Sequence, residues 1–109
     1  SDFVYQLVAS GRLPAEERIT IDGRSAFRDV AAARDPKGVE PRFFFQKVPE
    51  PKTAKNRCHV DVRVDPEQKD AKSDHLIGLG ATFVEQHSDR GPTVTYVMRD
   101  PEGNEFCLD

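Results

Sequence analysis

Two segments of the chain alternate apolar and polar residues with a period of two, which is typical of a β-strand with one buried face. In the first, residues 57–64, cysteine and valine alternate with charged residues and His59. In the second, residues 105–108, the large apolar side chains and Glu105 point to opposite faces. If the two strands lie side by side with their apolar faces on the same side, His59 and Glu105 share the polar face of the sheet.

A helix and two further strands are predicted between these segments. Asp65 is typical of a helix N-cap, Pro66 of the first helical position, and Gln68 of a capping box that closes the first turn. The apolar stripe predicted for this helix, which the glycines at 78 and 80 end, consists of Ala71, Leu76 and Leu79. Strands are predicted near 82–87 and 93–99, so the second half of the chain is expected to run strand, helix and three strands.

The first half of the chain has a weaker periodicity. Residues 2–11 carry apolar residues at helical spacing and end in glycine, which predicts a short helix. Residues 18–22 are predicted as a strand that stops at the hairpin turn Asp22-Gly23. The returning strand is expected over 26–32, although the alanines of this segment suit a helix equally well. With a further strand over 42–46, the expected order is one helix and three strands.

One turn motif occurs twice. Arg-Asp-Pro-x-Gly stands at residues 34–38 and again at 99–103, each time before a short segment that contains phenylalanine. Aspartate and proline suit the first two positions of a β-turn, and glycine tolerates the positive φ that reverses the chain. The repetition indicates a duplicated unit. The prolines and lysines of residues 48–56 argue against a central strand and indicate a linker between the two halves.

Composition narrows the class of protein. The chain has 109 residues, a one-domain length, with 37% hydrophobic and 32% charged residues and a net charge of -3. The sequence has no basic block of the kind that binds nucleic acid. No apolar run approaches the roughly 18 residues of a membrane span. We therefore expect a cytoplasmic protein with a small-molecule partner. Cys58 and Cys107 are predicted on opposite strand faces, and therefore as two thiols rather than a disulfide.

Four segments in this order resemble the glyoxalase-like branch of the vicinal oxygen chelate superfamily, which also holds bleomycin-resistance proteins and extradiol dioxygenases. These segments are residues 41–52, 55–61, 79–82 and 100–107. The resemblance implies an α+β fold of paired βαβββ modules whose mixed sheet curls around a cleft. Within a single domain over residues 1–109, residues 1–47 are then the first module, 48–56 the linker and 57–109 the second module. The first strand of the first module is missing from the chain, which implies residues upstream of Ser1 or a strand from a partner, and in either case a homodimer.

The resemblance also implies where a metal ion binds. Members of the superfamily hold the metal with one residue from the first and one from the last strand of each module, and His59 and Glu105 stand at the two positions of the second module. Superposing the two turn motifs places Arg42 at the position equivalent to Glu105, and the fourth position precedes Ser1. Because arginine repels a cation, two interpretations stay open: a divalent ion (Zn, Ni, Mn or Fe) on His59 and Glu105, or no metal.

The two interpretations imply different functions. With a metal, the protein is a lyase, isomerase or dioxygenase for a small molecule with neighbouring oxygens, and Glu105 is also the catalytic residue that moves a proton. Without a metal, Arg42, His59 and Glu105 recognise a polar group of a sequestered ligand, or Arg42 and Glu105 form an ion pair that needs no ligand. A domain used only for association is a third alternative. The ligand-binding residues expected along the cleft are Arg42, Phe44, Gln46, Asp61 and Tyr96.

Overall fold

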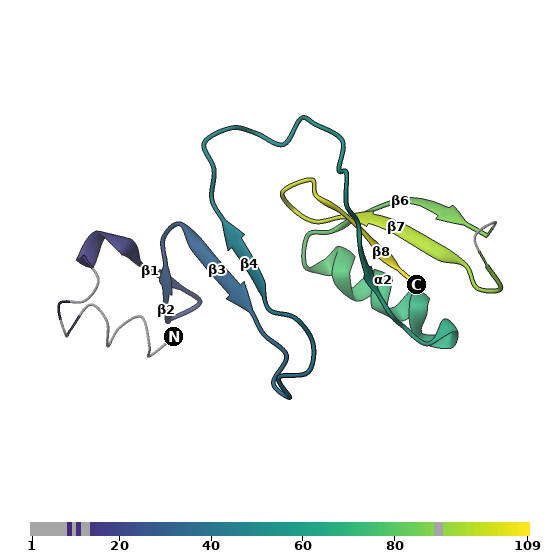
Figure 1. Ribbon diagram of the computed structural model, residues 1–109, viewed down its shortest axis with the longest axis horizontal. Helices are drawn as coiled ribbons and strands as arrows, with labels where there is room; N and C mark the ends of the chain where they lie inside the picture. Colours follow the sequence, from purple (N-terminus) through teal and green to yellow (C-terminus); the bar gives the residue numbers. More distant parts are fainter. Residues whose placement is uncertain (1–8, 10, 12–13, 89–90) are drawn as a thin grey trace. The chain divides into compact units, whose positions relative to one another are not determined.

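The computed structural model describes residues 9, 11, 14–88 and 91–109, and the helix predicted over residues 2–11 lies almost entirely outside them. The chain divides into two compact units, Ser1–Glu50 and Pro51–Asp109 (Figure 1). Over the described residues the fold class is α+β, with one α-helix and several strands in open sheets. Neither the α-helix nor the 3-10 turns of these residues are long and apolar enough to cross a membrane.

A hairpin begins the described part of the first unit. It follows a 3-10 turn, η1 (Ala15–Glu17), and consists of the antiparallel strands β1 (Arg18–Ile21) and β2 (Arg24–Phe27). The two residues between the strands have φ values of 50° at Asp22 and 76° at Gly23. Two successive positive φ values are what a type I′ hairpin turn requires, and Asp-Gly supplies them at low cost. The predicted Asp22-Gly23 hairpin is therefore confirmed.

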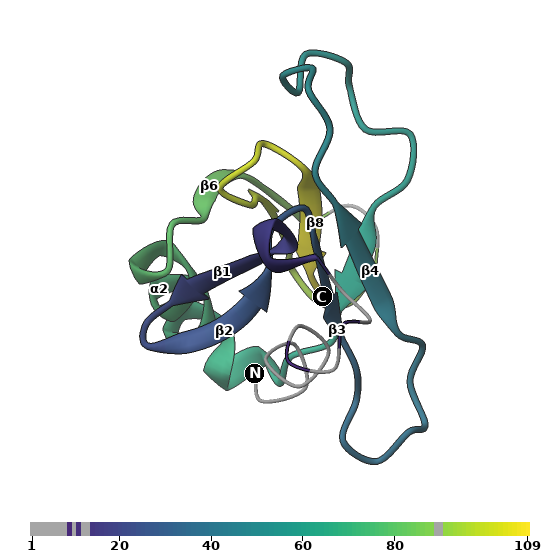
Figure 2. The ribbon, with the colours of Figure 1, turned by 90° about the vertical axis from the view of Figure 1, so that its left-hand side faces the viewer.

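The returning strand predicted over residues 26–32 is not continuous. The second sheet of this unit consists of β3 (Val30–Ala33) and β4 (Phe43–Gln46), which pair antiparallel. The N–H of Arg28 still donates to the carbonyl of Glu17, at 2.7 Å, whereas the carbonyl of Asp29 already accepts from the N–H of Lys47, at 2.7 Å. The backbone changes its pairing partner between residues 28 and 29, and this change divides the segment into β2 and β3 (Figure 2).

The two Arg-Asp-Pro-x-Gly motifs form the same turn. In each, the glycine N–H donates to the carbonyl of the aspartate three residues earlier, Asp35 or Asp100, at 2.9 Å. Each aspartate carboxylate also accepts the N–H of the residue two positions later, at 3.0 Å in the first turn and 2.9 Å in the second. Both glycines have positive φ, 69° at Gly38 and 89° at Gly103. The equivalence predicted from the sequence is confirmed at the level of the turn.

The second unit contains a four-stranded mixed sheet. Its strands are β5 (Val60–Val62), β6 (Thr82–His87), β7 (Thr95–Arg99) and β8 (Glu105–Leu108). Their order is β5-β8-β7-β6, with β5 parallel to β8 and the other neighbours antiparallel. The side-by-side placement of β5 and β8 confirms the prediction, but β5 is shorter than the predicted strand 57–64. The pairing of β5 with β8 begins at Val60, opposite Phe106, and residues 57–59 before it form no regular strand.

The helix of this unit begins differently from the prediction. A 3-10 turn, η2 (Pro66–Gln68), leads into α2 (Lys69–Gly78). The predicted capping box is wrong, because neither Asp65 nor Gln68 makes a side-chain capping hydrogen bond. The Gln68 N–H instead donates to the Asp65 carbonyl at 2.9 Å, so a backbone bond closes the first turn.

The predicted apolar stripe of the helix is also wrong in part. Ala71 is exposed and Leu79, just beyond the helix, is 66% exposed, while Leu76 is half-buried. The buried residues of α2 are Lys69 and Ser73, which are 4% and 6% exposed. Positions 69, 73 and 76 are spaced by four and three residues and share one face, so the helix buries two polar residues where an apolar stripe was expected.

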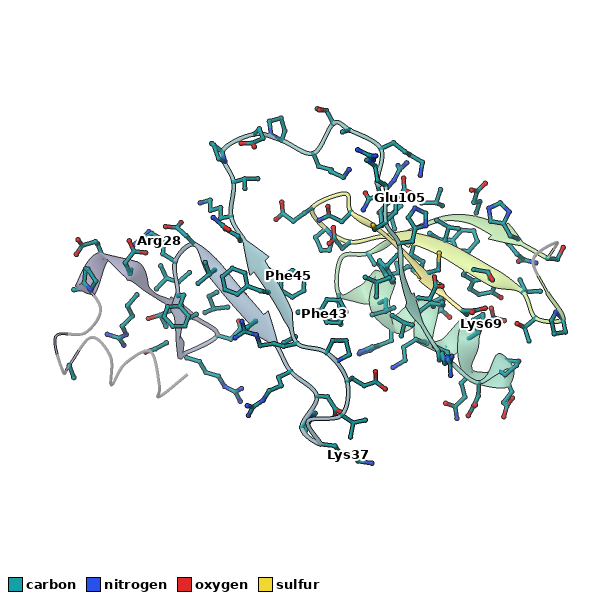
Figure 3. The ribbon with its side chains drawn as sticks, in the orientation of Figure 1. Arg28, Lys37, Phe43, Phe45, Lys69 and Glu105 are labelled. Atoms are coloured by element: carbon teal, nitrogen blue, oxygen red, sulfur yellow. The ribbon has the colours of Figure 1, made fainter. Side chains whose placement is uncertain are left out.

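The core of the described residues lies in the two central strands of the second unit. Its buried apolar residues are Val97 and Met98 on β7, and Cys107 and Leu108 on β8. In the first unit, the three consecutive phenylalanines of β4 are between 41% and 56% exposed. Figure 3 shows the side chains of Phe43 and Phe45 on this strand. The second unit therefore has the better-formed core.

Candidate functional site

Glu105 is held firmly at the start of β8. Its side chain is only 8% exposed, and in the sheet it stands opposite Arg99 of β7. Its backbone N–H donates to the side-chain oxygen of Asn56 at 3.2 Å. The turn that begins at Asp100 fixes where β8 starts, because the Asp100 N–H donates to the carbonyl of Asn104, the residue before Glu105, at 2.8 Å. The carboxylate therefore projects from a fixed backbone.

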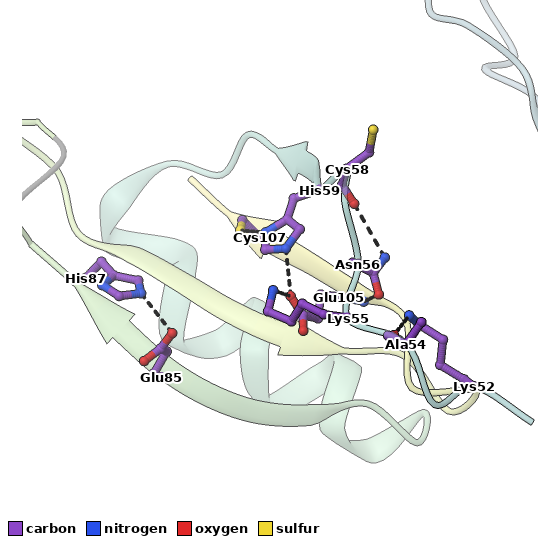
Figure 4. A network of polar contacts seen from close by, with 10 residues as sticks. All are labelled: Lys52, Ala54, Lys55, Asn56, Cys58, His59, Glu85, His87, Glu105 and Cys107. Carbon is purple, nitrogen blue, oxygen red and sulfur yellow. Dashed lines mark hydrogen bonds and ion pairs between the residues drawn. The ribbon is translucent and has the colours of Figure 1, made fainter.

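Two nitrogen donors meet one oxygen of this carboxylate (Figure 4). Nε2 of His59 and Nζ of Lys55 each lie 2.6 Å from Oε2 of Glu105. His59 directly precedes β5, and its side chain is 30% exposed, whereas that of Lys55 is 73% exposed. The prediction that His59 and Glu105 share the polar face of the sheet is confirmed. Lys55, His59 and Glu105 are called the Glu105 cluster below.

The charge of Glu105 is stabilised by this arrangement. The hydrogen bond from Lys55 is the largest cause that holds the pKa of the Glu105 carboxyl below its usual range, and the charge and hydrogen bond of His59 add to it. Burial acts in the opposite direction but is outweighed. Glu105 is therefore an ionised carboxylate at neutral pH, and a carboxylate accepts hydrogen bonds only, so Nε2 of His59 carries a proton.

The second ring nitrogen of His59 faces a thiol. Its Nδ1 lies 3.6 Å from Sγ of Cys107, which is 5% exposed on the same face of β8 as Glu105. Cys58 is exposed, and neither cysteine is in a disulfide, as predicted. A contact between His59 and Cys107 was not predicted from the sequence. The parallel register of β5 with β8 would have indicated this contact, because it places His59 beside both Glu105 and Cys107.

The Glu105 cluster fits a divalent metal poorly. A metal site needs three or more side chains whose donor atoms converge on one point, and the described residues contain no such group of His, Cys, Asp or Glu. A ligating imidazole presents a lone pair, but Nε2 of His59 donates a proton to Glu105. The ammonium of Lys55 already lies on the same oxygen. We therefore derive no chemical step through a metal.

Asp61 and Tyr96, the other two predicted site residues of the second unit, lie outside the Glu105 cluster: neither is hydrogen-bonded to Lys55, His59 or Glu105. Asp61 is exposed on β5 beside Cys107. Tyr96 stands opposite Leu108 in the sheet, which places it on the other face from Glu105. Its hydroxyl donates to Asp70 of α2 at 2.5 Å, and this hydrogen bond is the largest cause that raises the pKa of Tyr96. Tyr96 therefore ties β7 to the helix.

The three predicted residues of the first unit lie on or beside β4. The guanidinium carbon of Arg42 is 5.7 Å from the ring centroid of Phe44, within the range of a cation–π contact. Phe44 is 56% exposed, and Gln46 stands opposite Val30 of β3. The pairing of Arg42 with Glu105 concerns two different units and stays a prediction.

Sequence reasoning missed Lys55. Lys55 belongs to the linker predicted over residues 48–56, and a single lysine of such a segment carries no signal for one particular partner. Its position depends on Asn56, the next residue, which contacts the backbone N–H of Glu105. Only the folded arrangement reveals that the segment before β5 passes the start of β8.

A separate open cavity of about 300 Å³ lies at the beginning of the helix. Its lining residues are Arg63, Val64, Asp65, Pro66, Lys69, Thr93 and Asp109. The ammonium of Lys69 donates a hydrogen bond to the Val94 carbonyl. Its nitrogen also lies over the Tyr96 ring, 5.6 Å from the ring centroid. The lining has two cationic side chains, Arg63 and Lys69, and two carboxylates, Asp65 and Asp109, so its charges balance. Lys69 is also held by Val94 and Tyr96. The Glu105 cluster is therefore the stronger candidate for a functional site.

The sequence comparisons place these observations in a family. A family model described as glyoxalase-like domain matches residues 5–108, nearly the whole chain. No curated protein and no solved structure gave a significant match.

Proposed function

The chain belongs to the glyoxalase-like domain family of the vicinal oxygen chelate superfamily, and on this premise we propose that it is a small-molecule binding protein that works without a metal. One observation carries the proposal: Oε2 of Glu105 is contacted by both Lys55 and His59 at 2.6 Å. The protein's own cation balances the carboxylate in the place where the family resemblance implies a metal. The Glu105 cluster then serves to recognise a polar group of an organic ligand.

The proposal includes the assembly that the family resemblance implies. The second unit runs strand, helix and three strands, in agreement with a βαβββ module. The two equivalent turns support a duplicated origin for the first unit. We propose that the two units form a cleft with Arg42 near Glu105, and that the chain acts as a homodimer. The exposed rings of Phe43 and Phe45, whose centroids lie 6.5 Å apart on one face of β4, support association, because aromatic side chains are enriched at protein interfaces.

A binding screen in EDTA tests the proposed function. A library of small polar compounds is screened against the protein by ligand-detected NMR, with Glu105→Gln beside the native chain. Glu102→Gln is the matched control, because Glu102 is an exposed carboxylate three residues away and its side chain makes no contact with the Glu105 cluster. We expect compounds whose affinity falls about tenfold or more with Glu105→Gln, and stays unchanged with Glu102→Gln. Binding that requires an added divalent ion would overturn the proposal.

A metal-dependent enzyme is the second candidate. The 2.6 Å contact between His59 and Glu105 favours it, because the two residues that the resemblance implies as ligands are neighbours. A metal could bind there only if Lys55 left and His59 turned its nitrogen away from Glu105. In that case the ion would act as a Lewis acid towards neighbouring oxygens of a substrate. Added metal that shifts the NMR signals of His59 and Glu105 together would favour this candidate.

A further inference from the structure

Lys55 and Glu105 form an ion pair whose two members are held very differently. Glu105 lies on a strand with neighbours on both sides, and its side chain is 8% exposed. The side chain of Lys55 is 73% exposed and comes from a segment, residues 51–59, without helix or strand. Its contact with Glu105 is the hydrogen bond to Oε2. The carboxylate is fixed, and the ammonium is the movable partner.

Release of the ammonium costs little, while loss of all cations from Glu105 costs more. An exposed lysine in an ion pair gains little net stability, because water and salt compete for its charge. A carboxylate that is largely removed from water, in contrast, needs a partner for its charge. Exchange of Lys55 for another cation keeps Glu105 neutralised throughout. The pair is therefore arranged so that one cation can replace another.

The backbone around Lys55 does not depend on this ion pair. Asn56 accepts the Glu105 N–H through its side-chain oxygen and donates its side-chain amide to the Cys58 carbonyl at 3.4 Å. Lys52 donates to the Ala54 carbonyl within the same segment. The segment can therefore stay beside β8 after the lysine ammonium has moved away.

The position that the Lys55 ammonium occupies beside Glu105 suits an organic cation better than a metal ion. Nδ1 of His59 faces Cys107 and Nε2 faces Glu105, so the imidazole has no nitrogen lone pair directed at the position of the Lys55 ammonium. An ammonium or guanidinium group needs only acceptors, and Oε2 of Glu105 already accepts one such group at 2.6 Å.

We propose that Glu105 is a cation subsite for ligands that carry a primary ammonium or guanidinium group, and that Lys55 is its internal occupant, which such a ligand displaces. This inference rests on the proposed function and names the ligand class of the same site. Lys55 thereby acts as a specificity-determining residue: it leaves for a cation with N–H donors and stays in place for neutral or anionic compounds.

The test measures n-butylammonium binding through the carboxyl carbon signal of Glu105, assigned with Glu105→Gln, in ¹³C-labelled full-length protein at constant ionic strength. Lys55→Ala is expected to bind n-butylammonium about fivefold more tightly than the native chain, because the tethered competitor is gone. Lys55→Arg keeps a tethered cation and is expected to match the native chain. Tetramethylammonium, which has no N–H donor, is expected to leave the Glu105 signal unchanged.

Three results would overturn the inference. Equal affinity of the native chain and Lys55→Ala for n-butylammonium would show that Lys55 does not occupy the subsite. An equal response to tetramethylammonium would show screening rather than binding. Loss of the folded circular dichroism spectrum in Lys55→Ala but not in Lys55→Arg would make Lys55 a structural residue.

The outcome separates the inference from the proposed function. If the compounds found in the EDTA screen depend on Glu105 but bind equally well after their amine is acetylated, the ammonium assignment fails and the binding function stands. If binding in that screen needs a divalent ion, the proposed function itself fails.

Discussion

The two Arg-Asp-Pro-x-Gly turns have the same hydrogen bonds but lead to different strands. After the Asp35 turn comes β4, which pairs with β3 in a two-stranded sheet and leaves its residues exposed. After the Asp100 turn comes β8, which lies between β5 and β7 and buries Glu105, Cys107 and Leu108. Local sequence determines the turn, whereas the neighbours of the following strand determine whether its side chains are buried.

The comparison explains why the candidate site forms in the second unit. A carboxylate on a two-stranded, exposed sheet would be surrounded by water and would need no particular partner. On β8, Glu105 is largely removed from water and is met by His59, from the segment leading into β5, and by Lys55. The parallel neighbour β5 thus supplies the groups that make Glu105 a site.

The largest expected difference between the two strands is in the free energy of unfolding. Leu108→Ala on β8 removes a side chain with 0% exposure and is expected to lower it by about 3 kcal/mol. Phe44→Ala on β4, at 56% exposure, is expected to cost about 1 kcal/mol or less. Denaturant unfolding followed by circular dichroism measures both. Equal losses would show that β4 is as buried in solution as β8.

Removal of the aspartate from each of the two turns is expected to give a smaller difference in the free energy of unfolding. The Asp100 carboxylate accepts hydrogen bonds from the backbone of Glu102 and Asn104 and from the Asn104 side chain, at 2.9, 2.8 and 3.1 Å. Asp100→Ala is expected to lower the free energy of unfolding by about 2 kcal/mol, because the turn positions a central strand. Asp35→Ala, which removes a comparable set of bonds before β4, is expected to have a smaller effect. A larger effect of Asp35→Ala in the same unfolding assay would contradict this ranking.

The smallest expected difference is in how two carboxyl groups, that of Asp35 in the first turn and that of Glu105 just after the second, respond to low pH. Asp35 and Glu105 both have a pKa below the usual 3.8 and 4.5, the first through backbone N–H groups, led by that of Lys37, and the second through Lys55. A carboxyl whose pKa is lowered by folding contributes stability that is fully present above its unfolded pKa and is lost as pH falls through its folded pKa. Lys55→Met is therefore expected to raise the pKa of Glu105 and leave that of Asp35 unchanged.

NMR titration of the carboxyl carbons measures both groups in one sample. The native chain is also expected to lose more stability than Lys55→Met as the pH falls below about 4.5, the unfolded value for Glu105. An unchanged Glu105 titration in Lys55→Met would show that the ion pair does not persist in solution.

Much of the second unit could be predicted from the sequence, because its signals are local. Period-two alternation indicated β8 and the neighbouring strand β5, and the Asp100 turn followed from the conformations that its residues favour. The contact of His59 with Glu105 followed from placing two polar faces together. These predictions needed only the period of a strand and the chemistry of a turn.

The remaining features depend on packing between distant segments. The division of the returning strand at residues 28 and 29 results from a change of pairing partner, which no residue of the segment signals. The buried face of α2 carries Lys69 because its ammonium reaches the Val94 carbonyl, 25 residues away. Lys55 meets Glu105 across 50 residues of sequence. Such contacts are decided by the fold as a whole.

A metal titration tests the central claim most directly. Zn²⁺, Ni²⁺, Mn²⁺ and Fe²⁺, the last under anaerobic conditions, are titrated into the native full-length chain and into a His59→Ala, Glu105→Ala double variant, and bound metal is measured after equilibrium dialysis. The account predicts no difference between the two proteins, because Nε2 of His59 donates to Glu105 and the described residues contain no group of three ligands that would hold a metal ion. Close to one equivalent of metal in the native chain and none in the double variant would contradict it.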